Sequence, residues 1–319
     1  MRECPAHLLQ QKLRDLERAF KDGFDKKQKN KCLPKYKKRG LHDSFRFPSP
    51  QQVKLEYQHV TFPKLGRMRF YRSRAMEGEI KNYTVSRQGK HWTVAIPVEV
   101  ELKSTTVATK ATFAIGLDLG VKNFVTTSNG DHQAPVNSFR RFEKQLAIKQ
   151  GQQSKKKKFS ANWRKANEEV IRIHQRIANI RRDFQHKLST EICKNHAIIV
   201  VEALKIKNMS RSARGSLDNP GQQVAAKSGL NKSILDQGWY EFRRQVDYKS
   251  HWRGGLMIEV NPRYTSQRCS HCDYVDEKNR LTQEKFVCLR CRHTLNADVN
   301  AAKNILAAGH AVMACGASA

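Results

Sequence analysis

The chain has 319 residues, of which 60 are lysine or arginine and 29 are aspartate or glutamate, so its formal net charge is +31. A charge of this size indicates a long polyanion such as nucleic acid as partner; the alternative is a ribosomal-type or merely solubilising basic surface. No apolar run approaches the ~20 residues of a transmembrane helix, and the N-terminus lacks a secretory hydrophobic region. Four of the eight cysteines are scattered singly, which is typical of reduced thiols. We therefore expect a cytoplasmic protein with no membrane partner, built from two or three domains.

The first third of the chain predicts a helix followed by β-structure. Apolar residues at steps of three and four predict an amphipathic helix over residues 5–24. From Val53 to Val100 the period changes to two, and a Gln88-Gly89 turn within this stretch predicts a hairpin. Together with residues 53–71, the hairpin predicts a small β-barrel or sandwich.

The rest of the chain alternates buried strands with helices. Short apolar strands are expected at 113–117, 124–127, 197–201 and 255–260. Helical spacing predicts a long helix over 162–195 with a strongly basic face, a second over 233–252 and a small-residue helix over 298–308. Residues 205–232 are rich in Ser, Gly, Asn and Lys, which predicts a loop.

Two acids each follow a continuous apolar strand: Asp118 after the first and Glu202 after the third. Ligand sites in open α/β sheets form at such strand ends, and Asp298 would begin a helix that could lean over the same edge. Three carboxylates there suit Mg²⁺ or Mn²⁺, and two such ions about 4 Å apart can activate water to hydrolyse a phosphodiester. Taken singly, each acid is more often a turn residue or a helix cap, so the prediction depends on their joint placement.

The cysteine spacing predicts one structural zinc site. Two C-x2-C pairs separated by 15 residues have the ligand count of a tetrahedral Zn²⁺ site: Cys269, Cys272, Cys288 and Cys291. His271 and His293 lie inside the pairs, but four thiolates already complete the tetrahedron. A closed site of this kind contributes to folding and leaves no open position for catalysis.

Three further patterns carry weaker information. The four lysines 155–158 are as typical of a solvated loop as of a phosphate contact. Arginines on the 162–195 helix recur at one-turn spacing, which favours tracking of a nucleic-acid backbone. Aromatic residues crowd 239–252, and there they are more typical of a core than of a base-stacking platform.

The chain carries three stretches with a familiar order and spacing: Gly116–Asn123, Val200–Leu204, and Tyr264 through the cysteine pairs to Ala302. Together they resemble the transposon-encoded OrfB/TnpB proteins, relatives of the type V CRISPR effectors with a RuvC-like nuclease. Ser233–Trp239 is similar to the family's helix before the last core strand. The likeness covers nearly the whole chain.

The resemblance implies an α/β fold with an RNase H-like (RuvC) core and an inserted zinc ribbon, preceded by a β-barrel wedge domain and a helical segment. The implied boundaries are 1–45 for the helical recognition segment, 46–110 for the wedge, 111–262 and 296–319 for the core, and 263–295 for the ribbon. It assigns Asp118, Glu202 and Asp298 as nuclease carboxylates holding Mg²⁺ or Mn²⁺, and the four cysteines as zinc ligands. The implied activity is cleavage of target DNA chosen by a guide RNA from the transposon end; older descriptions use the word transposase.

The chain departs from the family pattern at its start and in the ribbon. The family usually carries several dozen residues before the counterpart of Pro5, so we expect either a truncated gene or a misplaced start. A glycine commonly follows the second cysteine of each pair, where this chain has Asp273 and Arg292. Arginine adopts a left-handed backbone less readily than aspartate, so strain is expected at the second pair.

Two other functions remain open from the sequence. One is a truncated or decayed relative that binds DNA or RNA without cutting. The other is a transposase that performs strand transfer in DNA recombination; it should need a nucleophile, and no compelling tyrosine or serine motif is found.

Overall fold

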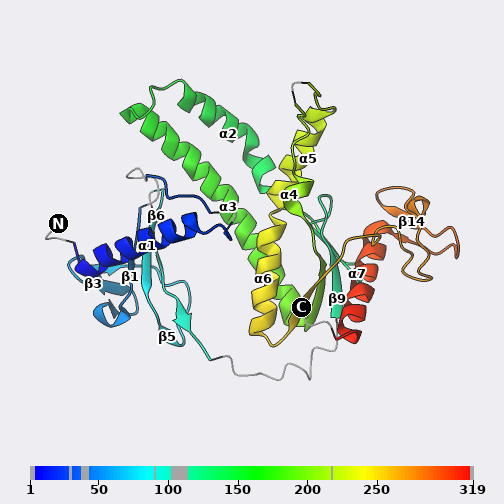
Figure 1. Ribbon diagram of the computed structural model, residues 1–319, viewed down its shortest axis with the longest axis horizontal. Coiled ribbons are helices and arrows are strands. Elements are labelled where there is room, and N and C mark those ends of the chain that lie inside the picture. The colour runs from blue at the N-terminus through cyan, green and yellow to red at the C-terminus, as the bar shows by residue number, and fades with distance from the viewer. Residues whose placement is uncertain are drawn as a thin grey trace. The chain divides into compact units, whose positions relative to one another are not determined.

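The computed structural model describes residues 4–28, 31–36, 43–89, 91–101, 114–216 and 218–316 (Figure 1). The chain divides into two compact units, Met1–Lys103 and Ser104–Ala319. The boundary expected between 110 and 111 lies outside the described residues. No helix within the described ranges is both long and apolar enough to cross a membrane.

The first unit combines one helix with short antiparallel strands. Helix α1 (Ala6–Phe24) confirms the amphipathic prediction and packs beside β1 (Ser44–Phe47). Three small sheets follow, in the orders β1-β6-β7, β2-β3-β4 and β5-β8. Their remaining strands are β2 (Lys54–Leu55), β3 (His59–Phe62), β4 (Gly66–Arg69), β5 (Glu79–Ile80), β6 (Tyr83–Gln88), β7 (His91–Ala95) and β8 (Val98–Glu99).

The β-barrel prediction is wrong as to closure, because the described strands form separate sheets and no closed barrel. The aromatic core joins faces of two of these sheets. Phe47 of β1 stacks on Phe62 of β3 with ring centroids 4.6 Å apart, and Tyr83 of β6 meets Phe62 edge-on at 5.9 Å. The strands are two to six residues long, and the core is buried between the facing sheets that they form. Such sandwich-like packing is the alternative to a barrel that the sequence left open.

The second unit is built on a five-stranded mixed sheet in the order β11-β10-β9-β12-β13. Strands β9 (Ala114–Asp118), β10 (Val125–Thr127) and β11 (His132–Gln133) are antiparallel neighbours, while β12 (Ile198–Glu202) and β13 (Leu256–Val260) run parallel to β9. These strands confirm the expected positions within one residue, although Phe113 lies outside the described residues.

Helices cover both faces of this sheet. Leu188 and Ile192 of α3 (Ala161–Asn195), with Phe242 of α6 (Trp239–Trp252), pack against one face of the strands. Helix α7 (Ala297–Ala314) covers the other, where Ile305 contacts Val200 and Ile258. Because both faces are buried, the central strands carry apolar residues without alternation.

The segment before β13 differs from the prediction. Residues 205–232 include α4 (Ile206–Met209) and most of α5 (Val224–Gln237), where a loop was expected. The helix expected over 233–252 is divided by Gly238, whose φ is +66°. The break is stabilised from outside: the Gln185 side chain on α3 donates to the carbonyls of Gln237 and Gly238. Helix α2 (Ser138–Ser154) was also not predicted.

Helix α7 lies against β9 at a position that only glycine permits. A Cβ atom on Gly116 would lie 2.1 Å from the carbonyl oxygen of Ala302, and 2.9 Å from the backbone nitrogen of Leu306. Both atoms belong to the backbone of the helix and cannot rotate away. The missing side chain therefore sets how closely α7 approaches the sheet.

We expect Gly116→Ala to lower the free energy of unfolding by about 1–3 kcal/mol, because α7 must move away from β9. Gly229→Ala is the matched control: Gly229 is exposed inside α5 with nothing within 4 Å of its Cβ position. This control should be neutral or about 0.5–1 kcal/mol more stable. Urea denaturation measures both, and equal stabilities would contradict the close approach.

Candidate active site and metal centre

Asp118 and Glu202 end two neighbouring parallel strands at the same edge of the sheet. The register places Val201 of β12 opposite Leu117 of β9, one residue before each acid. Side chains alternate along a strand, so Asp118 shares a face with Gly116, and Glu202 shares a face with Val200. That is the face covered by α7. The two predicted acids therefore face the same helix.

Asp298 is the second residue of α7. The side chain of Asn296 caps this helix by accepting from the backbone N–H groups of Asp298 and Val299, at 3.0 and 3.2 Å. The N-terminal position gives Asp298 a favourable location for its negative charge. The cap was not predicted; the sequence had suggested Asp298 itself for that role.

The electrostatics show that the three carboxylates lie close together. Burial, together with the smaller effects of the negative charges on Glu202 and Asp298, raises the pKa of Asp118 to about 7, while Arg280 acts in the opposite direction. Burial also raises the pKa of Glu202, against a hydrogen bond from Thr265. In a buried site, neighbouring negative charges disfavour ionisation of each carboxyl group, and a bound cation would favour the ionised form.

Three partners of these acids were not predicted from the sequence. The Thr265 hydroxyl donates to Glu202 Oε1 at 2.5 Å. Asn123 Nδ2 donates to Asp298 Oδ2 at 3.4 Å, and Arg280 Nη2 forms an ion pair with Asp298 Oδ1 at 3.2 Å. All three lie within the stretches that carried the family resemblance, but Arg280 was not itself singled out from the sequence.

The chemistry of the acids fits divalent metal. Hard carboxylate oxygens are the ligands that Mg²⁺ and Mn²⁺ prefer, and Asp118, Glu202 and Asp298 would hold such ions. Among the described residues, however, the one group of ligand atoms that all lie within 4.8 Å of one another is the cysteine group. The carboxylates approach each other closely enough for their charges to interact, without forming so compact a cluster.

The four predicted cysteines come together with the geometry of a metal site. Their Sγ atoms all lie within 4.8 Å; Cys269 and Cys291 are 3.7 Å apart, and Cys272 and Cys288 are 3.5 Å apart. A tetrahedron with Zn–S bonds of about 2.3 Å requires sulfur atoms ~3.8 Å apart. His271 and His293 stack on each other at 5.3 Å and are not members of this group.

Both cysteine pairs turn through a left-handed residue. Asp273 has φ +59° and Arg292 has φ +61°, and each donates its N–H to the carbonyl of the first cysteine of its pair. The left-handed backbone expected at these positions is therefore present. Arg292 holds it without the side-chain hydrogen bonding that makes this region accessible to aspartate and asparagine.

The segment between the cysteine pairs meets the acids directly. Beside the Arg280–Asp298 pair, Lys122 of the β9–β10 loop forms an ion pair with Glu284. The buried Asn300 and Asn304 of α7 donate to the carbonyl of Arg268, and Asn304 also donates to that of Thr265. Two successive turns of α7 are thus hydrogen-bonded to the residues just before Cys269, the first of the four cysteines.

The chain is similar in sequence to two protein families and to individual relatives. Residues 95–213 match the OrfB_IS605 family, described as "Probable transposase", and residues 239–305 match the Cas12f1-like TNB domain family. The chain is 51% identical over 99% of its length, and 77% of the relative's, to "Putative RNA-guided DNA endonuclease InsQ" of Escherichia coli K12. A "Putative RNA-guided DNA endonuclease" of Streptomyces pristinaespiralis is 32% identical over 97% of this chain and 72% of its own length. A solved Cas12f1–sgRNA–target DNA complex gives a TM-score of 0.47 at 17% identity, covering 71% of this chain and 45% of that one.

These matches place the chain among proteins described as transposases and as putative RNA-guided DNA endonucleases. The chain belongs to the OrfB/TnpB family. The resemblance predicted from the three sequence stretches is thereby confirmed.

We expect Arg292→Gly to stabilise the zinc-loaded protein by up to ~1 kcal/mol, because the left-handed backbone costs a non-glycine residue about 1–2 kcal/mol. Arg290→Gly removes the same charge two residues earlier, where φ is not positive, and should instead lose about 0.5–1 kcal/mol. Thermal unfolding with zinc present compares the two; equal losses would show that Arg292 carries no backbone strain.

Proposed function

We propose that this chain is a metal-dependent DNA endonuclease guided by RNA. The observation that carries the proposal is the convergence of Asp118, Glu202 and Asp298 on the face under α7, with the pKa of Asp118 raised to about 7. Close relatives are named RNA-guided DNA endonucleases over nearly the whole of this chain. The strand order, three antiparallel followed by two parallel, supports an RNase H-like (RuvC) core.

The three acids would hold Mg²⁺ or Mn²⁺, which when bound supplies an activated water and stabilises the leaving oxygen of a phosphodiester. Around them each side chain has a positioning role. Thr265 orients Glu202, and Asn123 orients Asp298. The Arg280 guanidinium, 28% exposed beside Asp298, can turn to a phosphate and stabilise the negative charge that develops during cleavage.

The other parts of the molecule take supporting roles in this proposal. Zn²⁺ on the four cysteines would fold the ribbon that carries Arg280 to the acids. We assign 1–45 to a helical recognition segment, 46–110 to a wedge domain, 111–262 and 296–319 to the nuclease core and 263–295 to the ribbon. A net charge of +31 suits target DNA together with a guide RNA from the transposon end.

Asp118→Ala should reduce Mg²⁺-dependent cleavage on the order of 10³-fold or more while leaving nucleic-acid binding nearly unchanged, because Asp118 serves the reaction and not the backbone contacts. The assay uses protein co-expressed with transposon-end RNA and a matched target duplex. Asp183→Asn, which removes an exposed acid paired with Lys187 on α3, is the control and should cut normally.

The same assay distinguishes the remaining alternatives. Cleavage by Asp118→Ala at the unsubstituted rate would refute the site assignment. No cleavage by either protein, with binding retained, would favour a binding protein that does not cut, and joined DNA ends among the products would favour a transposase.

Arg280→Ala should lower the cleavage rate about 100-fold, the usual cost of losing one charged or hydrogen-bonding group that stabilises a transition state. Arg280→Lys keeps the charge and should recover part of the rate. The matched control is Arg290→Ala, which lies on the exposed part of the ribbon. Single-turnover rates at saturating Mg²⁺ measure the effect; equal rates for Arg280→Ala and Arg290→Ala would remove Arg280 from the mechanism.

A further inference from the structure

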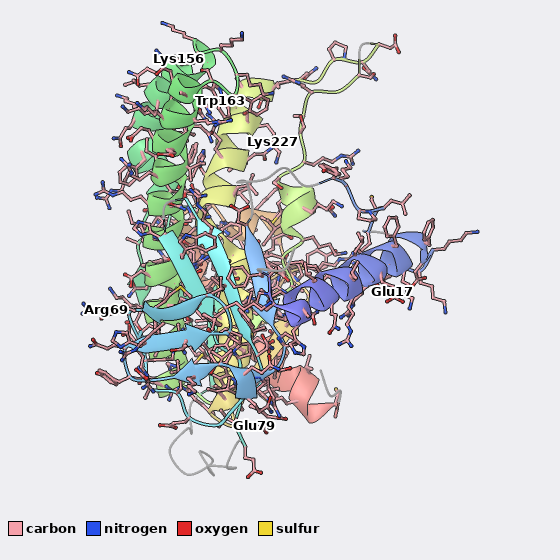
Figure 2. The ribbon with its side chains drawn as sticks, turned by 90° about the vertical axis from the view of Figure 1, so that its left-hand side faces the viewer. Glu17, Arg69, Glu79, Lys156, Trp163 and Lys227 are labelled. Atoms are coloured by element: carbon pink, nitrogen blue, oxygen red, sulfur yellow. The ribbon has the colours of Figure 1, made fainter. Side chains whose placement is uncertain are left out.

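The four lysines singled out in the sequence lie at the tip of a long helical hairpin. Helices α2 and α3 pack against each other, and residues 155–160 connect them. Figure 2 shows Lys156 and Trp163 together at this end of the hairpin. Trp163 precedes the sheet-packed Leu188 by 25 residues. At 1.5 Å per residue, the tip stands ~38 Å along α3 from the sheet.

An aromatic residue is held at this tip in an unusual backbone conformation. Phe159 has φ +70° and is half-exposed, at 50%. Its ring meets Trp163 edge-on at 5.4 Å, and the Lys158 ammonium lies 5.4 Å from the ring centroid. A left-handed backbone is unfavourable for a bulky residue, so the position is one where strain accompanies an outward-placed ring.

The charge of the tip is not neutralised within the unit. Elsewhere basic residues pair with nearby acids, as Arg172 does with Glu169 and Lys187 with Asp183 on the same helix. Among the residues that the structure describes, no acid forms an ion pair with Lys155, Lys156, Lys157 or Lys158, and all four are exposed. Exposed Arg164 and Lys165 extend the basic surface by one turn of α3.

We propose that this tip, residues 155–159 with Trp163, is a second nucleic-acid contact and binds the guide RNA. The proposal rests on the proposed function. The lysines would contact successive phosphates and the Phe159 ring would stack on an unpaired base, which is how proteins commonly recognise single-stranded RNA. The cleaved DNA strand must reach the acids, whereas a tip ~38 Å away along the helix suits the RNA, which does not have to.

A purely structural role for Phe159 makes different predictions. Phe159 precedes Ser160, whose side chain caps α3 by accepting from the Trp163 N–H at 3.2 Å. An apolar contact across a helix N-terminus can simply fix how the chain enters the helix. That role would affect stability but would leave both salt dependence and contact with RNA unchanged.

The charge is tested with Lys156→Gln/Lys157→Gln in Asp118→Ala protein, so that binding is measured without cleavage. The probe is a single-stranded RNA 20-mer of mixed sequence. Loss of two phosphate contacts should reduce the slope of log binding constant against log salt by about 1.4. The exposed pair Lys194→Gln/Lys303→Gln is the charge-matched control and should change the slope by less than half as much. Equal changes in the two variants would overturn the proposal.

The aromatic contact is tested with Phe159→Leu and ultraviolet cross-linking to the same RNA, followed by peptide mapping. The unsubstituted tip should cross-link within residues 158–163, and Phe159→Leu should reduce that yield at least fivefold. A lower melting temperature with unchanged cross-linking would establish the structural role instead. Cross-linking to duplex DNA of the same sequence but not to RNA would overturn the RNA assignment. Failure of the proposed function appears separately, as absence of Mg²⁺-dependent cleavage by the unsubstituted chain.

Discussion

The close contact between α7 and β9 at Gly116 is the constraint on which the acid cluster depends. Asp118 lies two residues beyond Gly116, which is ~6.6 Å along a strand. Asp298 lies four residues before Ala302, the residue whose carbonyl meets Gly116, which is ~6 Å along a helix. The chain runs in opposite senses through the two elements, so both displacements lead toward the same edge. A side chain at 116 would separate the two acids, and the charge interaction between them would weaken.

The cysteine segment extends this arrangement and depends on it. Asn300 and Asn304 of α7 donate hydrogen bonds to the residues just before Cys269. Between the two cysteine pairs, Arg280 then forms an ion pair with Asp298 of the same helix. Figure 1 shows β14 (Lys285–Val287), within this segment, beside the start of α7. Folding of the four cysteines around a metal would therefore fix the Arg280 guanidinium next to the acids. The metal on the cysteines itself would take no part in the reaction. The positive charge of Arg280, which offsets the repulsion between the carboxylates, thus comes from the segment that carries the four cysteines.

The sequence predicted those parts of the fold that local patterns determine. Apolar strands ending in Asp118 and Glu202, the 35-residue helix α3 and the cysteine spacing each have a periodic or spaced signature. The partners Thr265 and Arg280 have none, because their roles come from distant pairing. Barrel closure also could not be inferred, since alternation indicates a half-buried strand without specifying which edges pair. The three carboxylates of the proposed site could thus be named from the sequence, whereas the side chains that contact them could not.

Helix α2 shows most clearly why the remainder was out of reach. Its N-cap residue, Asn137, is left-handed and makes no side-chain cap. The cap comes instead from Asp236 of α5, whose buried carboxylate accepts from the Ser138 hydroxyl and the Phe139 N–H, 98 and 97 residues away. Gln185 of α3 likewise donates hydrogen bonds to the carbonyls of Gln237 and Gly238, at the junction between α5 and α6. Buried polar groups without partners are costly, so these bonds fasten the base of the hairpin firmly to α5 and α6. A hairpin fixed at its base and left basic at its tip can hold a bound polyanion at a set distance from the sheet.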